Sequence, residues 1–358
     1  MKTMQATREQ RRDNLRKRLK AEGVDALIVT HAANRYYLSG FELHDSQCNE
    51  SAGWLVITAD GREKLLTDPR YEDAAKRVFP AEDVFIYAGA KFDQIGPFLK
   101  GLGIQTYGFE PRAMHLYDYD KVQEHVRLVS TTNLVEDLRL FKDEEEIRLM
   151  RASCALNHRV FRALEDSLRP GQTEEDVAWT AERMFRESGA SELAFSTIVG
   201  VGKNAALPHA IPGRTPLKEG ELVLVDMGCR LGNYCSDQTR TFWVGDTPSD
   251  RFRTVREQVK TAQQKAIEAI RPGLPIAEAY NIARKHFEDE GVADRFTHAL
   301  GHGIGLETHE PPSLSSIARG ELKAGMVITV EPGLYWPDWG GVRWEFMVLV
   351  TEDGCEVL

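Results

Sequence analysis

The stretch ELVLVDMGCRLGNYCSDQTRTFW, residues 221–243, decides the fold of the second half of this chain. Four consecutive apolar residues, 222–225, form a β-prone run near its start, and the residues up to Trp243 are again rich in β-branched and aromatic side chains. Between the two runs lies the pair Gly-Asn at 232–233, a dipeptide that favours a tight turn. The stretch is therefore predicted to be a β-hairpin.

Two aspartates face each other in this predicted hairpin. If the turn is centred between Leu231 and Gly232, Asp226 lies directly opposite Asp237, with Cβ atoms about 5 Å apart. Carboxylates this close repel each other unless they share a proton or a cation lies between them. The alternative is a pair of solvent-facing aspartates, and a second acidic segment decides between the two interpretations.

That segment, MVITVEPGLYWPDWGGVRWEFMVLVT at residues 326–351, is predicted to be another hairpin. Glu331 and Glu345 lie equally far from Asp338 in its loop, so they are candidate cross-strand partners, although a Pro-Gly pair interrupts simple pairing. Between the two hairpins, HALGHGIGLETHE at residues 298–310 contains three histidines among glycines. Two acidic hairpins that flank a Gly/His segment indicate a metal site.

Metal binding explains why these carboxylates are placed in apolar strands. Four carboxylates on inward faces carry four negative charges, and burying them unpaired is costly. Two divalent cations cancel this charge. Carboxylates with one imidazole are suited to Mn(II), Co(II), Zn(II) or Fe(II), and they differ from a thiolate zinc site. Paired ions of this kind activate a water and polarise a carbonyl, so the pattern predicts metal-assisted hydrolysis.

The motifs VDMG, SDQTRT, GHGIGLETHE, ITVEPGLY and GGVRWE resemble those of the "pita-bread" metallopeptidases, which include methionine aminopeptidases, aminopeptidase P, prolidases and creatinase. The resemblance covers the whole chain, because the N-terminal part is similar to the creatinase/prolidase N-terminal domain. It implies an α/β N-terminal domain at residues 1–134 and an α+β pita-bread catalytic domain at residues 135–358. In the family, the first domain overhangs the active site and helps to choose substrates.

The resemblance also implies a set of five metal ligands for two divalent ions. In this set Asp226 chelates one ion, and Asp237 and Glu345 bridge both ions. His302 and Glu331 complete the shell of the second ion.

Further roles follow from the same resemblance. His209 is expected to bind substrate near the metals, and His298 and His309 to stabilise the intermediate and contact the scissile residue. Glu331 is the candidate for moving a proton to the leaving nitrogen. Arg343 is expected to orient the carboxylates, with a surface strand arginine as the alternative interpretation.

The implied reaction is removal of the N-terminal residue from peptides with proline at the second position. Two departures from the family pattern bear on it. Phe346 stands where many relatives have an acid, and strand alternation puts it on the face away from Glu345. Ser313, in HEPPS, stands where some dipeptide-specific prolidases have an arginine that binds the terminal carboxylate, so a bidentate contact is missing unless another arginine replaces it. Longer peptides, as used by aminopeptidase P, are therefore favoured over strict dipeptides.

Three alternative functions remain beside this one. Methionine aminopeptidases usually lack such an N-terminal domain. A metal-independent, creatinase-like C–N hydrolase is disfavoured because members of that type lack part of the ligand set. A non-catalytic peptide-binding module is disfavoured because all five ligands are intact.

Composition excludes several classes of protein. A formal net charge of −10 and a pI near 5.6 argue against a nucleic-acid binder, which carries basic patches. Five cysteines, an odd number without framework spacing, fit a reducing compartment. No stretch reaches the roughly 20 apolar residues of a membrane span, and the start lacks a secretory apolar core. A cytoplasmic enzyme is expected, and the resemblance implies a homodimer.

Strand and helix patterns alternate through the N-terminal part, as in an α/β domain. Helices are predicted at residues 7–22 and after Pro69, and strands at residues 26–30, WLVIT, KLLTD and VFIYA. The segment HAANRYYLSGF, residues 31–41, matches the family's early strand and loop. Four groups near predicted loops have either a structural or a substrate-binding role: Arg35, Tyr36, His44 and Asp45.

Beyond a boundary near residues 131–141, a long amphipathic helix is predicted, and its DEEE run is expected to be a solvated face. Further helices are predicted at residues 173–188, with Thr173 as N-cap, and at 249–270 and 276–291. RPG at 169–171 and RPGLP at 271–275 fall at corresponding points of two helix–turn–helix–strand halves. This spacing indicates an internal pseudo-repeat.

Overall fold

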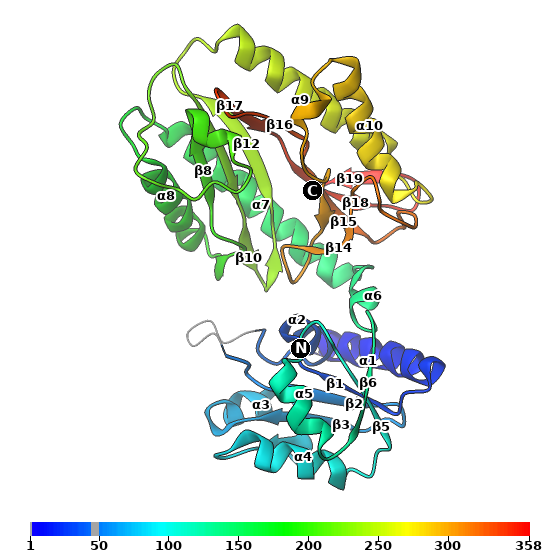
Figure 1. The fold of residues 1–358 in the computed structure, drawn as a ribbon. Coiled ribbons are helices and arrows are strands. Elements are labelled where there is room, and N and C mark those ends of the chain that lie inside the picture. The colour runs from blue at the N-terminus through cyan, green and yellow to red at the C-terminus, as the bar shows by residue number, and fades with distance from the viewer. Residues whose placement is uncertain (1, 44–49) are drawn as a thin grey trace. The chain divides into compact units, whose positions relative to one another are not determined.

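The computed structural model describes residues 2–43 and 50–358 and divides the chain into two compact units, 1–139 and 140–358 (Figure 1). His44 and Asp45 lie outside the described residues. The domain limits 1–134 and 135–358 stay a prediction, because family domains and compact units are defined by different criteria. Among the described helices, none is long and apolar enough to cross a membrane.

The first unit is a mixed six-stranded sheet with helices, as the alternating pattern predicts. Its strand order is β4-β3-β2-β1-β5-β6, with β1 antiparallel to β2 and parallel to β5. The elements are α1 (Lys2–Glu22), β1 (Ala26–Val29), α2 (Ala32–Ser39), β2 (Trp54–Thr58), β3 (Glu63–Thr67), α3 (Glu72–Val78), β4 (Val84–Ile86), α4 (Lys91–Gly101), β5 (Thr106–Phe109), α5 (Leu116–Gln123), β6 (Arg127–Ser130) and α6 (Glu136–Arg139).

One prediction for this unit is wrong, because residues 32–39 form the helix α2 in place of a strand and loop. Gly40 ends the helix in the left-handed conformation, with φ of 76°, and its N–H bonds to the Tyr36 carbonyl. Arg35 within this helix is fully buried and donates hydrogen bonds to the carbonyls of Gly53 and Glu42. Arg35 is therefore a structural residue of this unit.

The second unit consists of two halves in which a helix pair precedes a group of strands (Figure 1). The first half contains α7 (Glu144–Ser167), α8 (Glu174–Glu187), β7 (Glu192–Leu193), β8 (Ile198–Val201), β9 (Leu222–Met227), β10 (Cys229–Leu231), β11 (Tyr234–Cys235) and β12 (Gln238–Trp243). The second half contains α9 (Asp250–Ala269), α10 (Ile276–Asp289), β13 (His302–Gly303), β14 (Glu310–Ser313), β15 (Val327–Val330), β16 (Gly333–Trp336), β17 (Gly340–Arg343), β18 (Phe346–Val350) and β19 (Cys355–Val357). The larger sheets have the orders β12-β9-β8 and β14-β13-β15-β18-β19.

Equivalent contacts in the two halves support the predicted pseudo-repeat. The start of α8 forms an isolated bridge between Thr173 and Pro216, and the start of α10 forms one between Pro275 and Glu321. In sequence, LKEGELVLVDMG (217–228) corresponds to LKAGMVITVEPG (322–333). The correspondence places Asp226 and Glu331 at equivalent ends of β9 and β15, so each half contributes an acid at the same point.

The register of the first hairpin differs from the prediction. Asp226 is paired with Thr239, and Asp237 lies two residues along the return strand. The turn is centred on Gly232 and Asn233, one position later than expected, because both residues adopt positive φ (58° and 71°) as a two-residue hairpin turn requires. Because side chains alternate with a period of two, the two aspartates share a face as diagonal neighbours.

The second hairpin has the predicted register. Partners in the β15–β18 ladder and in the β16–β17 ladder are equally far from Asp338, so this register carries Glu331 opposite Glu345. The two glutamates lie between the ladders, at the point where the hairpin passes from one sheet to the other.

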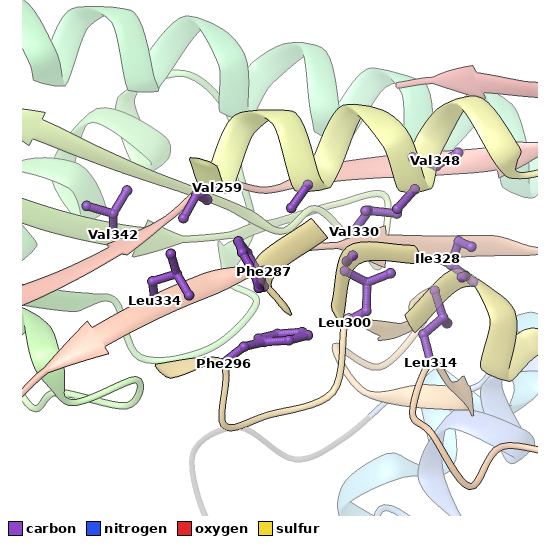
Figure 2. Packing of buried hydrophobic residues seen from close by; sticks show 14 of the residues in the cluster. Val259, Phe287, Phe296, Leu300, Leu314, Ile328, Val330, Leu334, Val342 and Val348 are labelled. Carbon is purple, nitrogen blue, oxygen red and sulfur yellow. The ribbon is translucent and has the colours of Figure 1, made fainter. Parts of the chain in front are cut away.

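The core of the second half lies between its helix pair and its strands. Figure 2 shows Phe287 and Phe296 beside Leu300 and Leu334 in this cluster. α9 and α10 carry buried apolar residues at helical spacing, which explains why both helices pack against the sheet. A rigid layer of this kind supports the strands that end at the acidic residues.

The acidic start of α7 is only partly solvated, contrary to the expectation for the DEEE run. Asp143 caps the helix by accepting hydrogen bonds from the N–H groups of Glu145 and Glu146. Glu146 is 2% exposed and accepts a hydrogen bond from the Tyr234 hydroxyl at 2.9 Å. The run therefore holds the helix start and anchors it to the first hairpin.

We expect Thr173→Ala to destabilise the second unit by about 1 kcal/mol, the usual loss for a helix cap. Thr173 and Asp176 form a capping box at the start of α8. Denaturant unfolding measures the change in the free energy of unfolding. Thr254→Ala, at an exposed position within α9, is the matched control and is expected to be neutral or slightly stabilising. Equal free energies of unfolding for the two variants would contradict the capping role.

Candidate metal centre

The structure brings the five predicted ligands together from distant parts of the chain. Four of them line one cavity of about 690 Å³, and they come from β9, the start of β12, β13 and the end of β15: Asp226, Asp237, His302 and Glu331. The fifth, Glu345, precedes β18 and is 1% exposed. Ligand atoms of Asp237, His302 and Glu345 all lie within 4.8 Å of one another.

The imidazole of His302 is oriented toward carboxylates. Its Nε2 lies 3.3 Å from Glu331 Oε1 and 3.7 Å from Asp237 Oδ2. Nδ1 lies 3.0 Å from its neighbour's carbonyl, that of Gly303, and the backbone N–H donates to the Thr329 hydroxyl. Because Nδ1 must donate to the carbonyl, Nε2 is the free ligand atom of the neutral ring.

Three carboxylate oxygens in this cluster are buried without a hydrogen-bond partner among the described residues: Asp226 Oδ1, Asp237 Oδ1 and Glu345 Oε1. Burial raises the pKa of all three groups, and that of Asp237 and Glu345 well above the usual range, with added repulsion from neighbouring carboxylates. Unsatisfied buried oxygens that repel one another are costly. The donor set therefore fits divalent cations, which would satisfy these oxygens and cancel their charge.

Glu331 behaves differently from the other carboxylates. Burial alone raises its pKa, but a protonated His302, through its hydrogen bond and charge, followed by His298 and Arg343, outweighs this effect and lowers the pKa to about 2. The Thr329 hydroxyl also donates to Glu331 Oε1 at 3.1 Å. Glu331 is thus an oriented carboxylate at the cavity wall.

Arg343 is 2% exposed, which excludes the surface-arginine interpretation. Its Nη2 donates to Asp226 Oδ2 at 2.6 Å. Its Nε donates to the Thr239 hydroxyl, which in turn donates to Glu345 Oε2 at 2.8 Å. Arg343 therefore orients carboxylates from both hairpins, one directly and one through a threonine.

A second chain of hydrogen bonds runs from Arg343 to His298. Arg343 Nη1 donates to the Tyr335 hydroxyl at 3.0 Å, and this hydroxyl lies 2.9 Å from His298 Nε2. His298 Nδ1 lies 2.7 Å from the Ala299 carbonyl, so Nδ1 carries the proton and Nε2 accepts from Tyr335. Both ring nitrogens of His298 are therefore engaged within the protein, although the residue lines the cavity.

His209 and His309 are the exposed histidines of the cavity. The His309 ring lies edge-on to His302, with centroids 4.3 Å apart. Burial, followed by the charge of His302, lowers the pKa of His309. His209 lies on the loop after Leu207. Both are accessible to a peptide in the cavity.

The two departures from the family pattern are also located by the structure. Phe346 is outside the cavity, with the Arg240 guanidinium 4.3 Å from its ring centre, as alternation predicted. Ser313 lines the cavity. Among the described residues of the cavity wall, Arg343 is the only arginine and no lysine is present.

Sequence reasoning missed three hydroxyl residues of the site: Thr239, Thr329 and Tyr335. Thr239 and Thr329 each lie two positions from an acid, Asp237 and Glu331, and strand alternation places such residues on one face. That spacing was the available signal for the threonines. The contact of Tyr335 with His298 crosses between separate segments, and no local pattern indicates it.

Comparison with known families matches residues 148–352 to metallopeptidase family M24 and residues 11–141 to the creatinase/prolidase N-terminal domain. The chain belongs to metallopeptidase family M24. The predicted pita-bread family and the predicted two-part fold class are thereby confirmed. The assignment of a metal-dependent hydrolase is confirmed at the level of the family.

Full-length relatives are known for this M24 protein. The Xaa-Pro dipeptidase of Pyrococcus furiosus is 33% identical over 98% of this chain and 97% of its own. The structure of an Xaa-Pro dipeptidase from Bacillus anthracis is similar with a TM-score of 0.91, 33% identity and coverage of 98% and 97%. An X-Pro aminopeptidase from Thermotoga maritima has a TM-score of 0.84 and 30% identity, with coverage of 94% and 95%.

Proposed function

We propose that this M24 protein is a dinuclear-metal exopeptidase that hydrolyses the bond between the N-terminal residue and proline of peptides. The single observation that carries the proposal is the set of three buried carboxylate oxygens without partners, beside His302 and Glu331 in one cavity. Relatives named Xaa-Pro dipeptidase or X-Pro aminopeptidase, similar over nearly the whole chain, support this substrate class.

In this proposal the five ligands hold two ions. Asp226, Asp237 and Glu345 would hold the ions together with His302 and Glu331, and Asp237 and Glu345 are the candidates for shared ligands. The oxygen-rich donor set with one imidazole suits manganese, cobalt, zinc or iron. When bound, such ions supply Lewis-acid polarisation of the scissile carbonyl and lower the pKa of a water.

The protein's own groups then handle the proton and the substrate. Glu331, oriented by the Thr329 hydroxyl, would accept the proton of the attacking water and pass it to the leaving nitrogen. This step matters for proline, because its scissile nitrogen is tertiary and must be protonated to leave. His309 and His209 are accessible donors for the substrate's carbonyl oxygens. His298 supports the wall through its bond with Tyr335.

We propose that peptides longer than two residues are preferred. In an Xaa-Pro dipeptide the free carboxylate belongs to the proline itself, beside the scissile bond, and a charge-assisted contact with a cationic side chain would favour its binding. Arg343 is the only arginine among the described residues of the cavity wall, and it is already paired with Asp226. Ser313 offers a hydroxyl where an arginine would bind such a carboxylate.

The test compares an Xaa-Pro dipeptide with Xaa-Pro tri- and pentapeptides, using protein loaded with Mn(II), Co(II) or Zn(II). We expect kcat/KM to be about tenfold or more higher for the longer peptides, because only the dipeptide leaves a charge unpaired. Ser313→Arg is expected to raise kcat/KM for the dipeptide and so to reduce its difference from the longer peptides. Ser313→Gln is the uncharged control of comparable length. A strong preference of the wild-type protein for dipeptides would reverse the inference.

The assembly and location are proposed from the resemblance. A homodimer is expected for this family, and light scattering after gel filtration tests it. A cytoplasmic location fits the four described cysteines, because none of them forms a disulfide bond: Cys154, Cys229, Cys235 and Cys355.

A further inference from the structure

Glu174, the first residue of α8, is a buried carboxylate that does not line the cavity of the metal centre. It is 1% exposed. Its Oε1 accepts hydrogen bonds from the Val201 N–H at 2.8 Å and the Asn204 side-chain amide at 2.9 Å, and Oε2 accepts from the Gly213 N–H at 3.0 Å. No described lysine or arginine forms an ion pair with it. Three N–H donors therefore stabilise this buried charge.

These donors lie at the two ends of one loop, residues 202–213. Val201, the last residue of β8, and Asn204 lie at its beginning, and Gly213 lies at its end. The Glu175 N–H adds a hydrogen bond to the Gly213 carbonyl at 3.0 Å, so the first turn of α8 closes the loop. Residues 202–206 of the loop form a short 3₁₀ helix. The further backbone hydrogen bonds of the described residues within the loop are also local, from Leu207 to Asn204 and from Ala210 to Leu207.

His209 lies in this loop and lines the cavity. Pro208, His209, Ile211 and Pro212 all line the cavity wall. His209 is exposed, and its side chain makes no hydrogen bond to any described residue. The place of this imidazole is therefore determined by the backbone of the loop. Glu174 holds this backbone at both ends, and the buried Ala205 and Ala210 pack it against the core.

We propose that Glu174 is a positioning residue that holds His209 at the cavity through the 202–213 loop. The inference rests on the proposed function, in which His209 binds the peptide. Only a carboxylate suits this place, because both of its oxygens accept. A glutamine would turn an NH₂ group toward a donor on one side, so one end of the loop would lose a hydrogen bond to this side chain.

The first test is hydrogen exchange of the metal-loaded protein, which needs no substrate. Glu174→Gln is expected to speed exchange of the amides of residues 201–213 by about tenfold or more, because the local opening becomes easier. The matched control is Glu175→Gln, which removes the same charge one position later, from an exposed side chain. Exchange in this loop that is equal in the two variants would overturn the inference.

The second test is a double-mutant cycle on hydrolysis of an Xaa-Pro tripeptide, with Glu174→Gln and His209→Ala alone and combined. We expect Glu174→Gln to lower kcat/KM by about 10- to 100-fold in the wild-type background and by less than about threefold in the His209→Ala background. A purely structural role would give full losses in both backgrounds, and that additive result would overturn the inference. Metal affinity, measured by titration, is expected to stay unchanged.

If Glu174→Gln fails to fold, Asn204→Ala replaces it in both tests, because it removes one donor and leaves the carboxylate in place. A loss of activity that depends on His209 supports the inference, and an additive loss overturns it. If the wild-type protein hydrolyses no Xaa-Pro peptide, the proposed function is wrong. Hydrogen exchange then still tests whether Glu174 holds the loop.

Discussion

Replacing Glu331 by glutamine is expected to lower kcat for Xaa-Pro peptides by about 10²–10⁴-fold, the range of general acid–base catalysis. The carboxylate accepts a hydrogen bond from the Thr329 hydroxyl and lies 3.3 Å from His302 Nε2, so it is oriented at the cavity wall. An amide keeps the shape and one carbonyl oxygen, but it cannot accept and release the proton that the proline nitrogen needs. Steady-state kinetics on the metal-loaded variant measure the loss.

Two controls separate proton transfer from other effects of this change. Glu321→Gln, at an exposed position in the same half of the second unit, is expected to keep wild-type kinetics. The metal content of Glu331→Gln has to be measured as well, because the same carboxylate is a proposed ligand. Near-normal turnover by a fully loaded Glu331→Gln protein would refute the assigned role.

Metal binding is expected to produce the second large effect, a rise in thermal stability. A ligand that binds only the folded state adds about 4 kcal/mol at a thousand times its Kd. For a unit of this size that corresponds to about 8–16 °C in Tm. Exhaustive chelation should therefore lower Tm by this amount and abolish peptide hydrolysis. Full activity after chelation would favour the metal-independent, creatinase-like alternative.

The variant Asp237→Asn is expected to change Tm in opposite directions in the metal-free and the metal-loaded protein. Without metal, burial and the neighbouring carboxylates oppose ionisation of Asp237 and raise its pKa well above the usual range, which costs stability at neutral pH. The uncharged amide removes this cost, so Tm should rise. With Mn(II) or Co(II) present, the loss of a ligand should remove most of the metal-induced rise. Calorimetry of both states measures the two changes. Asp246→Asn, an exposed aspartate after β12, should respond to metal as the wild type does.

Local pattern was sufficient for much of the fold. Helix caps, turn dipeptides and apolar periodicity depend on near neighbours, and α8, α9 and α10 begin at the predicted N-terminal signals within a residue or two. The first hairpin was placed correctly, but its register was not. A turn can shift by one residue at little local cost. Here the positive φ of Gly232 and Asn233 places the turn at these two residues and so sets the register.

The environment of the buried acids was less accessible to prediction. Glu146 and Glu174 stand in acidic first turns that are typical of solvated helix starts, yet both are buried and hydrogen-bonded. An acidic first turn of a helix is usually exposed to solvent, and the sequence pattern predicts only this usual case. Burial of one particular glutamate depends on which loop packs against it.

From the sequence by itself came the two acidic hairpins, which depend on residue type and short-range spacing, and the resemblance to a family, which implied the five candidate ligands. Only the tertiary structure decided the partners of those ligands: the contact of Arg343 with Asp226, the chain through Tyr335 to His298, and the attachment of the His209 loop to Glu174. Each joins segments that only sheet packing brings together. No local pattern contains that information, because the same residues in the same order could face other neighbours in a differently packed chain.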